Sequence, residues 1–209
     1  MAMARILKAD LEGLATAADV VAKGGLICYP TDTVYGLGCD PLNVAAVERA
    51  MKAKGDRTKP MPILVRELND AERLAYLSQR AKRLADRFWP GPLTMVLQAR
   101  DVLPRILAPT GSVGLRSPNH PICLDLLGLC SGILVGTSAN LGGRPPALSA
   151  KGALEELGDH VDLILDGGRP SLGLASTIID LTKPQLKILR EGPVGKEELL
   201  HCLRFHVRR

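Results

Sequence analysis

Short apolar runs alternate with amphipathic segments along this chain, and that alternation limits the fold more than any other feature. Leu14, Ala18 and Val21 recur at helical spacing between about residues 10 and 23. Gly24-Gly25 ends this predicted helix, and the apolar run 26–30 follows as a short buried strand. The same alternation continues to the C-terminal helix pattern, so the sequence predicts one α/β domain on a twisted mixed β-sheet flanked by helices.

The remaining elements are read from the same periodicities. Further strands are predicted at 62–65, 93–99, 112–116, 132–138, 161–166, 176–181 and 186–190. Further helices are predicted at 44–54 (capped by Asn43), 70–88 as one helix or two, 121–130, 149–157 and 196–205. The last two strands are joined by Thr182-Lys183-Pro184, which indicates a hairpin. With no repeat or linker, one domain is expected over residues 1–209, with its core at about 10–195.

Composition excludes several classes of protein. The chain has 209 residues, of which 46% are hydrophobic and 23% are charged, the balance of a globular protein rather than a disordered one. No apolar run approaches the roughly 18 residues of a membrane span, and the N-terminus lacks the apolar stretch of a signal peptide, so a cytoplasmic protein without membrane contact is expected. Five cysteines without a CxxC pair indicate buried, reduced thiols and no metal site.

The most informative segment is Tyr29-Pro30-Thr31-Asp32-Thr33-Val34-Tyr35-Gly36-Leu37-Gly38, where a buried strand runs into a polar turn and then into glycines. Thr31 and Thr33 can each donate and accept a hydrogen bond, which suits a small polar substrate, and the glycines would let the backbone approach it. The alternative is a strand-end turn in which Asp32 and the threonines bond their own backbone. The residues alone favour the alternative slightly.

A basic segment follows. Residues 49–59 carry five basic side chains against the single acid Asp56, namely Arg49, Lys52, Lys54, Arg57 and Lys59. Clustered cations around flexible backbone suit a triphosphate, although no Walker A or dinucleotide pattern is present. A solvated basic loop is the alternative, and the net charge of +5 does not decide between them.

Three later segments also place polar side chains at the ends of predicted strands. Arg116 ends an apolar strand, where a guanidinium could grip a carboxylate bidentately or form a structural salt bridge. Thr137-Ser138-Ala139-Asn140 follows another strand and precedes a glycine-rich turn, and Ser176-Thr177 lies beside a third. Polar turns at neighbouring strand ends suggest one shared pocket. The sequence contains no G-x-S-x-G elbow, and nucleophilic catalysis is poorly supported.

Seven segments together resemble the Sua5/YrdC/YciO family: YPTDTVYGLG, KGDRTKPMPILV, WPGPLTMVL, VGLRSPNHP, TSANLGGRPP, STIIDLT and ILREG. They occur in family order from about residue 10 to residue 195, and the chain's length is similar to the single-domain YrdC form. The resemblance implies an α/β fold around a large basic concave cleft. It also implies synthesis of threonylcarbamoyl-AMP from L-threonine, bicarbonate and ATP with Mg²⁺, for use by a downstream tRNA-modifying threonylcarbamoyl transferase.

The same resemblance implies roles for individual positions. L-threonine would be held by Thr33, Arg116, Ser138 and Ser176, with Arg116 on the carboxylate. ATP would be held by Lys54, Arg57, Lys59, Ser112, Asn140 and Arg190. No catalytic nucleophile and no protein-bound metal are implied, because positioning and cations would supply the catalysis.

The chain departs from the family pattern at two places. The loop from Lys54 to Lys59 is one residue shorter than usual, with Asp56 where the arginine of the K-x-R motif would stand, so Arg57 is expected to take that role. Leu64 stands where several members have a histidine.

Two alternatives follow. The shortened loop and the positive charge allow a YciO-like or RNA-binding protein without synthase activity, in which RNA or tRNA would bind directly. A carbamoyl-transfer domain of a hydrogenase-maturation protein is disfavoured, because no zinc-finger or acylphosphatase-like segment accompanies it.

Overall fold

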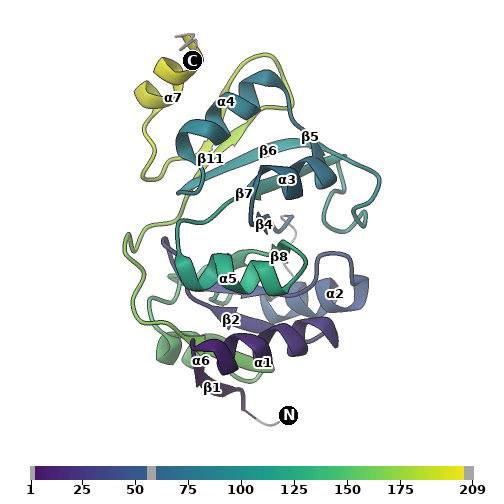
Figure 1. Cartoon of the computed structure of the whole chain (residues 1–209), viewed down its shortest axis with the longest axis vertical. Helices are drawn as coiled ribbons and strands as arrows, with labels where there is room; N and C mark the ends of the chain where they lie inside the picture. Colours follow the sequence, from purple (N-terminus) through teal and green to yellow (C-terminus); the bar gives the residue numbers. More distant parts are fainter. Residues whose placement is uncertain (1–2, 56–59, 205–209) are drawn as a thin grey trace.

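A computed structural model describes residues 3–55 and 60–204 of the chain, and it confirms the α/β class. The strands divide between two mixed sheets, where the sequence predicted a single one. In Figure 1 one sheet lies above the other, and the two termini lie at opposite ends of the molecule. The boundaries of the single domain and the basic concave cleft stay predictions.

The five-stranded sheet has the order β1-β10-β2-β3-β9. Strands β1, β10 and β2 are parallel, whereas β3 is antiparallel to both β2 and β9. The bounds are β1 Arg5–Lys8, β10 Leu163–Asp166, β2 Ile27–Tyr29, β3 Gly36–Gly38 and β9 Thr137–Ser138.

The seven-stranded sheet has the order β12-β11-β6-β7-β4-β8, with β5 paired to β6. Pairs β11–β6 and β4–β7 are parallel and the others are antiparallel, including the predicted hairpin β11–β12. The bounds are β12 Lys187–Arg190, β11 Thr177–Asp180, β6 Leu93–Ala99, β7 Ser112–Arg116, β4 Ile63–Val65, β8 Ile133–Val135 and β5 Ala75–Tyr76.

The division into two sheets has a local cause at Gly136. The predicted strand 132–138 is interrupted there, so that β8 joins one sheet and β9 the other. A Cβ atom on Gly136 would lie 2.4 Å from Cγ of Leu64, and the backbone N–H of Gly136 donates to the carbonyl of Pro62 at 2.8 Å. The backbone therefore crosses between the sheets against β4, at a place where a Cβ atom would clash with the side chain of Leu64.

Helices cover the sheets, and most begin at a polar cap. Side chains of Asp10, Asn43, Ser78 and Ser149 accept a hydrogen bond from the backbone N–H three residues on, which confirms the predicted cap at Asn43. The bounds are α1 Leu11–Ala22, α2 Val44–Ala53, α3 Leu68–Leu74, α4 Gln79–Phe88, α5 Pro121–Leu129, α6 Ala150–Leu157 and α7 Lys196–Arg204.

Strand β2 separates two apolar clusters. Cys28 belongs to the larger cluster, which extends to β4, β6 and β7, whereas Ile27 and Tyr29 belong to a smaller cluster beneath α1 and α5. Because successive side chains of a strand point to opposite faces, β2 is buried on both sides. The turn after β2 is consequently held in the interior of the molecule.

The glycines after this turn have a structural role that the sequence did not indicate. Gly36 and Gly38 form β3, and Cβ atoms there would lie 2.9 Å and 2.6 Å from ring atoms of Tyr29. The hydroxyl of Tyr29 donates to the carbonyl of Val135 at 2.8 Å. These two glycines therefore make room for a buried aromatic ring.

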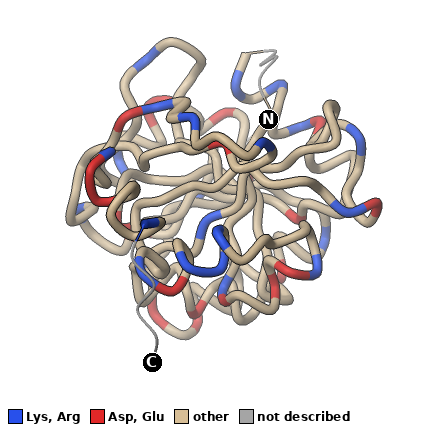
Figure 2. Tube along the Cα trace, turned by 90° about the horizontal axis from the view of Figure 1, so that it is seen from above, with Lys and Arg blue, Asp and Glu red and all other residues tan. Residues whose placement is uncertain are grey.

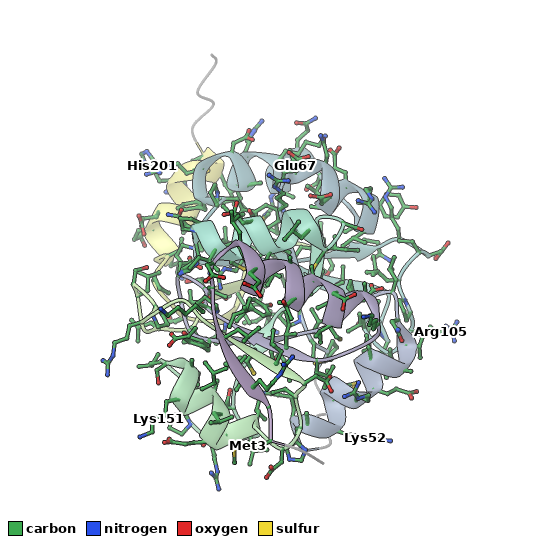
Figure 3. The ribbon with its side chains drawn as sticks, turned by 60° about the horizontal axis from the view of Figure 1, so that its bottom comes forward. Met3, Lys52, Glu67, Arg105, Lys151 and His201 are labelled. Carbon is green, nitrogen blue, oxygen red and sulfur yellow. The ribbon has the colours of Figure 1, made fainter. Side chains whose placement is uncertain are left out.

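Basic and acidic residues are interspersed over the trace in Figure 2. The side chains labelled in Figure 3, among them Lys52, Arg105 and Lys151, lie at the periphery and point outward. Within the two described stretches of chain, no helix combines the length and the apolar character needed to cross a bilayer.

The cysteines are free, and burial suppresses their reactivity. Cys28, Cys39 and Cys123 are buried, while Cys130 and Cys202 are partly exposed. Burial raises the pKa of Cys28 and of Cys39 to about 12, and it raises the pKa of Cys123 further still. Burial also raises the pKa of Cys130, to about 11.

A thiol-labelling experiment follows from this burial. At pH 8 iodoacetamide should modify Cys130 and Cys202 first, because the reactive species is the thiolate and the reagent must reach the sulfur. Cys28, Cys39 and Cys123 should react at least about 100-fold more slowly until urea unfolds the chain. Peptide mass spectrometry measures both classes, and early labelling of Cys28 would contradict the burial of β2.

Candidate functional site

Arg116, at the end of β7, is the centre of a buried polar cluster. Its Nε donates to the carbonyl of Gly91 at 2.9 Å, Nη1 donates to Oγ1 of Thr33 at 2.7 Å, and Nη2 pairs with Oδ1 of Asp32. The side chains of Arg116 and Asp32 are 7% and 3% exposed. A guanidinium carries five N–H groups, so these bonds within the described chain leave one N–H on each terminal nitrogen.

The sequence allows Arg116 either to form a structural salt bridge or to bind a carboxylate bidentately, and the arrangement is compatible with both. The structural salt bridge exists, because Asp32 pairs with it. A carboxylate that binds a guanidinium bidentately accepts one N–H from each of two nitrogens, and one N–H remains on each of Nη1 and Nη2. Oδ2 of Asp32 is buried and has no hydrogen-bond partner in the described part of the protein. The ion pair between Arg116 and Asp32 is thus held in place by its hydrogen bonds, while two N–H groups of Arg116 and one oxygen of Asp32 have no partner in the described chain.

The turn after β2 positions Thr33 and Asp32. Oγ1 of Thr31 donates to the carbonyl of Val34 at 2.6 Å and accepts the N–H groups of Thr33 and Val34, both at 3.2 Å. Thr31 therefore behaves as the alternative interpretation of this turn predicted, whereas Asp32 and Thr33 turn toward β7. Leu64 is the parallel partner of Arg116 in the adjacent strand.

A second cluster surrounds Ser176, just before β11. Its Oγ lies 2.8 Å from Oγ1 of Thr94, and Arg190 donates from Nε to the carbonyl of Ser176 at 2.9 Å and from Nη2 to its Oγ at 3.0 Å. Thr94 is near the start of β6, which runs antiparallel to β7, so it lies at the same edge of the sheet as Arg116. The ladder register therefore brings Ser176 and Arg190 to the edge where Arg116 lies.

A third cluster holds the turn after β9. Ser138 pairs with Gly36 of β3, which follows the Thr33 turn directly. Nζ of Lys54 donates to the carbonyl of Ser138 at 2.6 Å, to the carbonyl of Asn140, and to Oδ1 of Asn140 at 3.1 Å. Lys54 is 2% exposed and therefore lies inside the protein.

One predicted residue, Ser112, is not joined to these clusters within the described chain. Ser112 begins β7 and lies 3.0 Å, oxygen to oxygen, from Thr110 in an exposed contact. It is four residues from Arg116 along an extended strand, a span of roughly 13 Å, so it lies at the opposite end of β7. Arg57 and Lys59 fall outside the described residues.

Asp32 and Thr94 take part in the clusters but are not among the predicted site residues. Asp32 stands between two predicted threonines, and a carboxylate at the end of a buried strand was a usable signal for a cationic partner. Thr94 gives no such signal, because a threonine in a strand is ordinary. His120, at the N-cap of α5, has a buried Nδ1 without a partner in the described chain, and burial lowers its pKa.

The fold and these clusters define a class of protein. It is an α/β protein in which a buried arginine and hydroxyl groups lie where strands of the sheets end, a donor set suited to a small polar anion. The family model described as "Telomere recombination" (Sua5_yciO_yrdC) matches residues 19–192. The chain belongs to the Sua5/YciO/YrdC family.

Relatives in this family are similar over most of the chain. The threonylcarbamoyl-AMP synthase of Pyrococcus abyssi is 39% identical over 188 residues, which are 88% of this chain and 55% of that protein. A relative from Mycobacterium tuberculosis is 38% identical over 194 residues, 91% of this chain and 89% of its own. The chain thus spans about half of the first relative and most of the second.

A solved structure agrees with the fold. The structure of P. abyssi Sua5 complexed with L-threonine superimposes with a TM-score of 0.90 at 35% identity, covering 97% of this chain and 60% of that one.

Proposed function

We propose that this chain is an L-threonylcarbamoyladenylate synthase, a nucleotidyltransferase that converts L-threonine, bicarbonate and ATP to threonylcarbamoyl-AMP and pyrophosphate. One observation carries the proposal: the buried guanidinium of Arg116 is fixed by Asp32, Thr33 and Gly91 and keeps one N–H on each terminal nitrogen. A carboxylate accepts such a pair bidentately. The likeness to a Sua5 structure complexed with L-threonine supports this substrate.

Hydroxyl groups would complete the threonine site. Thr33 lies against Arg116, and the hydroxyl of Ser138 makes no hydrogen bond within the described chain, which leaves it available for the substrate. Ser176 would approach from the same edge of the sheet, oriented by Thr94 and Arg190. These hydroxyl groups can accept a hydrogen bond from the ammonium group of a substrate or donate one to its hydroxyl. Such a site suits threonine more than an apolar amino acid.

The nucleotide would lie against the remaining predicted positions. Arg190 would contribute a cation beside Ser176. Asn140 would approach the nucleotide from the turn after β9, and Ser112 would approach it from the far end of β7. Arg57 and Lys59, together with Lys54, complete the residues proposed for ATP.

The chemistry needs positioning more than a nucleophilic side chain. The amine of threonine attacks the carbon of bicarbonate, and water leaves, which gives an N-carboxylate. An oxygen of that carboxylate then attacks the α-phosphorus of ATP, and the bond to pyrophosphate breaks. Arg116 would hold the substrate carboxylate away from the reacting amine, and the arginine and lysine side chains would balance the phosphate charge.

Mg²⁺ would arrive with the nucleotide. The described residues contain no group of three or more His, Cys, Asp or Glu that could hold a metal ion. Mg²⁺ is commonly held by substrate phosphates and waters with few protein carboxylates, so this residue set fits a metal delivered as MgATP.

The proposal extends to the cellular role. The product would pass to a tRNA-modifying threonylcarbamoyl transferase, and the protein would work in the cytoplasm. Direct contact with RNA or tRNA would use the excess of Lys and Arg, 27 against 22 acidic residues.

Pyrophosphate release tests the proposal. Purified protein with MgATP should release pyrophosphate only when both L-threonine and bicarbonate are present, and omission of either should reduce the rate at least about 10-fold, as expected when a reactant is absent. Release that ignores threonine, or none at all, would refute the synthase. Salt-sensitive RNA binding without such release would favour a family member that lacks synthase activity.

A further inference from the structure

Lys54 differs from a phosphate-binding lysine in its surroundings. It is 2% exposed, whereas Lys52, two residues earlier on α2, points away from the molecule (Figure 3). An ammonium carries three N–H groups, and the described chain places three acceptors around this one: the carbonyls of Ser138 and Asn140 and Oδ1 of Asn140. The backbone carbonyl of Lys54 also accepts the N–H of Gly142 at 3.0 Å.

The opposite side of the same turn is held by an acid. Oε2 of Glu156 accepts the N–H of Leu141 at 3.1 Å, and Oε1 pairs with Arg144 at 3.3 Å. The hydrogen bond from Leu141 lowers the pKa of Glu156, with Arg144 and Lys54 adding to the effect. The turn 138–144 is thus held between a cation and an anion.

The turn itself offers few donors to a phosphate. The backbone N–H groups of Ala139, Asn140, Leu141, Gly142 and Arg144 all donate within the protein. The amide nitrogen of Asn140 donates to the carbonyls of Leu141 and Arg144 at 2.7 and 2.8 Å. Anion-binding loops work through free N–H groups, and these five are already used.

We propose that Lys54 is a positioning residue that fixes the turn carrying Ser138, and that it acts on the binding of L-threonine rather than on the triphosphate. This inference rests on the proposed function and reassigns one of its ATP residues. A buried ammonium bonded to two carbonyls and an amide oxygen fixes the backbone at Ser138 and the side-chain orientation of Asn140. The hydroxyl of Ser138 is then presented at a constant place beside β3.

The test compares three ligands by calorimetry: L-threonine, ATP and adenosine, which lacks every phosphate. In Lys54→Met the affinity for L-threonine should fall at least about 10-fold, as expected for a displaced hydrogen-bonding group. The preference for ATP over adenosine should stay within about twofold of the unmodified protein, because no phosphate contact is lost. Lys52→Met is the matched control and should change neither quantity.

A second variant separates charge from position. Lys54→Arg keeps the positive charge but places a planar, larger group where the ammonium fits, so L-threonine binding should still weaken at least about fivefold. If Lys54 instead contacted a phosphate of ATP, Lys54→Arg would bind ATP nearly normally and L-threonine as well as the unmodified protein does.

Hydrogen exchange provides a readout without ligand. In Lys54→Met the amides of Leu141 and Gly142 should exchange at least about 10-fold faster than in the unmodified protein, because the turn is released. Unchanged exchange at these amides would overturn the inference, as would a 10-fold loss of the preference for ATP over adenosine. If the unmodified protein binds neither L-threonine nor ATP, the proposed function fails instead, and the exchange rates still decide the role of Lys54.

Discussion

Arg116→Lys should lower kcat/KM for L-threonine by about 100-fold or more, while KM for ATP changes by less than about threefold. A guanidinium can give two parallel N–H groups to a carboxylate, and a lysine ammonium is a point charge that cannot reproduce that geometry. Two charge-assisted hydrogen bonds at about 1.5–3 kcal/mol each account for a loss of this size. Steady-state pyrophosphate release, with each substrate varied in turn, measures both parameters.

The control for this experiment is Arg105→Lys, a substitution of an exposed arginine at the periphery of the molecule (Figure 3). It should leave both parameters unchanged. Equal losses toward L-threonine and ATP in Arg116→Lys would indicate that the arginine supports the fold of the site and does not bind the carboxylate.

Asp32→Ala should reduce the free energy of unfolding by about 3–5 kcal/mol, because it leaves the buried guanidinium of Arg116 without its counter-ion. Equilibrium urea denaturation followed by circular dichroism measures the change. Asp32→Asn is the matched comparison, since its amide oxygen can still accept a hydrogen bond from Nη2 of Arg116. Its loss in the free energy of unfolding should be less than half of the loss in Asp32→Ala.

A double substitution checks the cause of that loss. Adding Arg116→Met to Asp32→Ala removes the unpaired charge, so the double variant should be more stable than Asp32→Ala alone. If the two losses simply add, Asp32 and Arg116 do not interact energetically, and the buried pair is not the reason that this turn and β7 stay together.

The sequence predicted the helices and the long strands well because their signals are local. Asn43 and Ser149 cap helices where hydrophobic periodicity begins, and β6 is a mostly apolar segment of seven residues. Strand β1 was missed, since it is short and its side chains are mostly exposed or half-buried. The pattern at Gly36 and Gly38 predicts a turn open to a ligand, whereas the structure shows strand β3 there. Its glycines lie against the ring of Tyr29, and Gly38 also lies against Val135 and Leu134.

The site was predicted as a set of residues but not as a set of contacts. Thr33 and Arg116 were both named, yet the bond between them spans 83 positions and depends on how two sheets meet. The charge of Lys54 groups it with the basic loop, although it lies at the end of α2 with its ammonium directed inward. Charge and spacing cannot show burial, and burial decides what such a lysine can bind.

The most direct test of the synthase is the identity of its product. With MgATP, L-threonine and ¹³C-labelled bicarbonate, rapid-quench mass spectrometry should find threonylcarbamoyl-AMP whose mass is raised by the single labelled carbon. The label must appear, because the carbonyl carbon of the product comes from bicarbonate. An adenylate that forms without the label, or pyrophosphate release with no threonine-containing adenylate, would contradict the account.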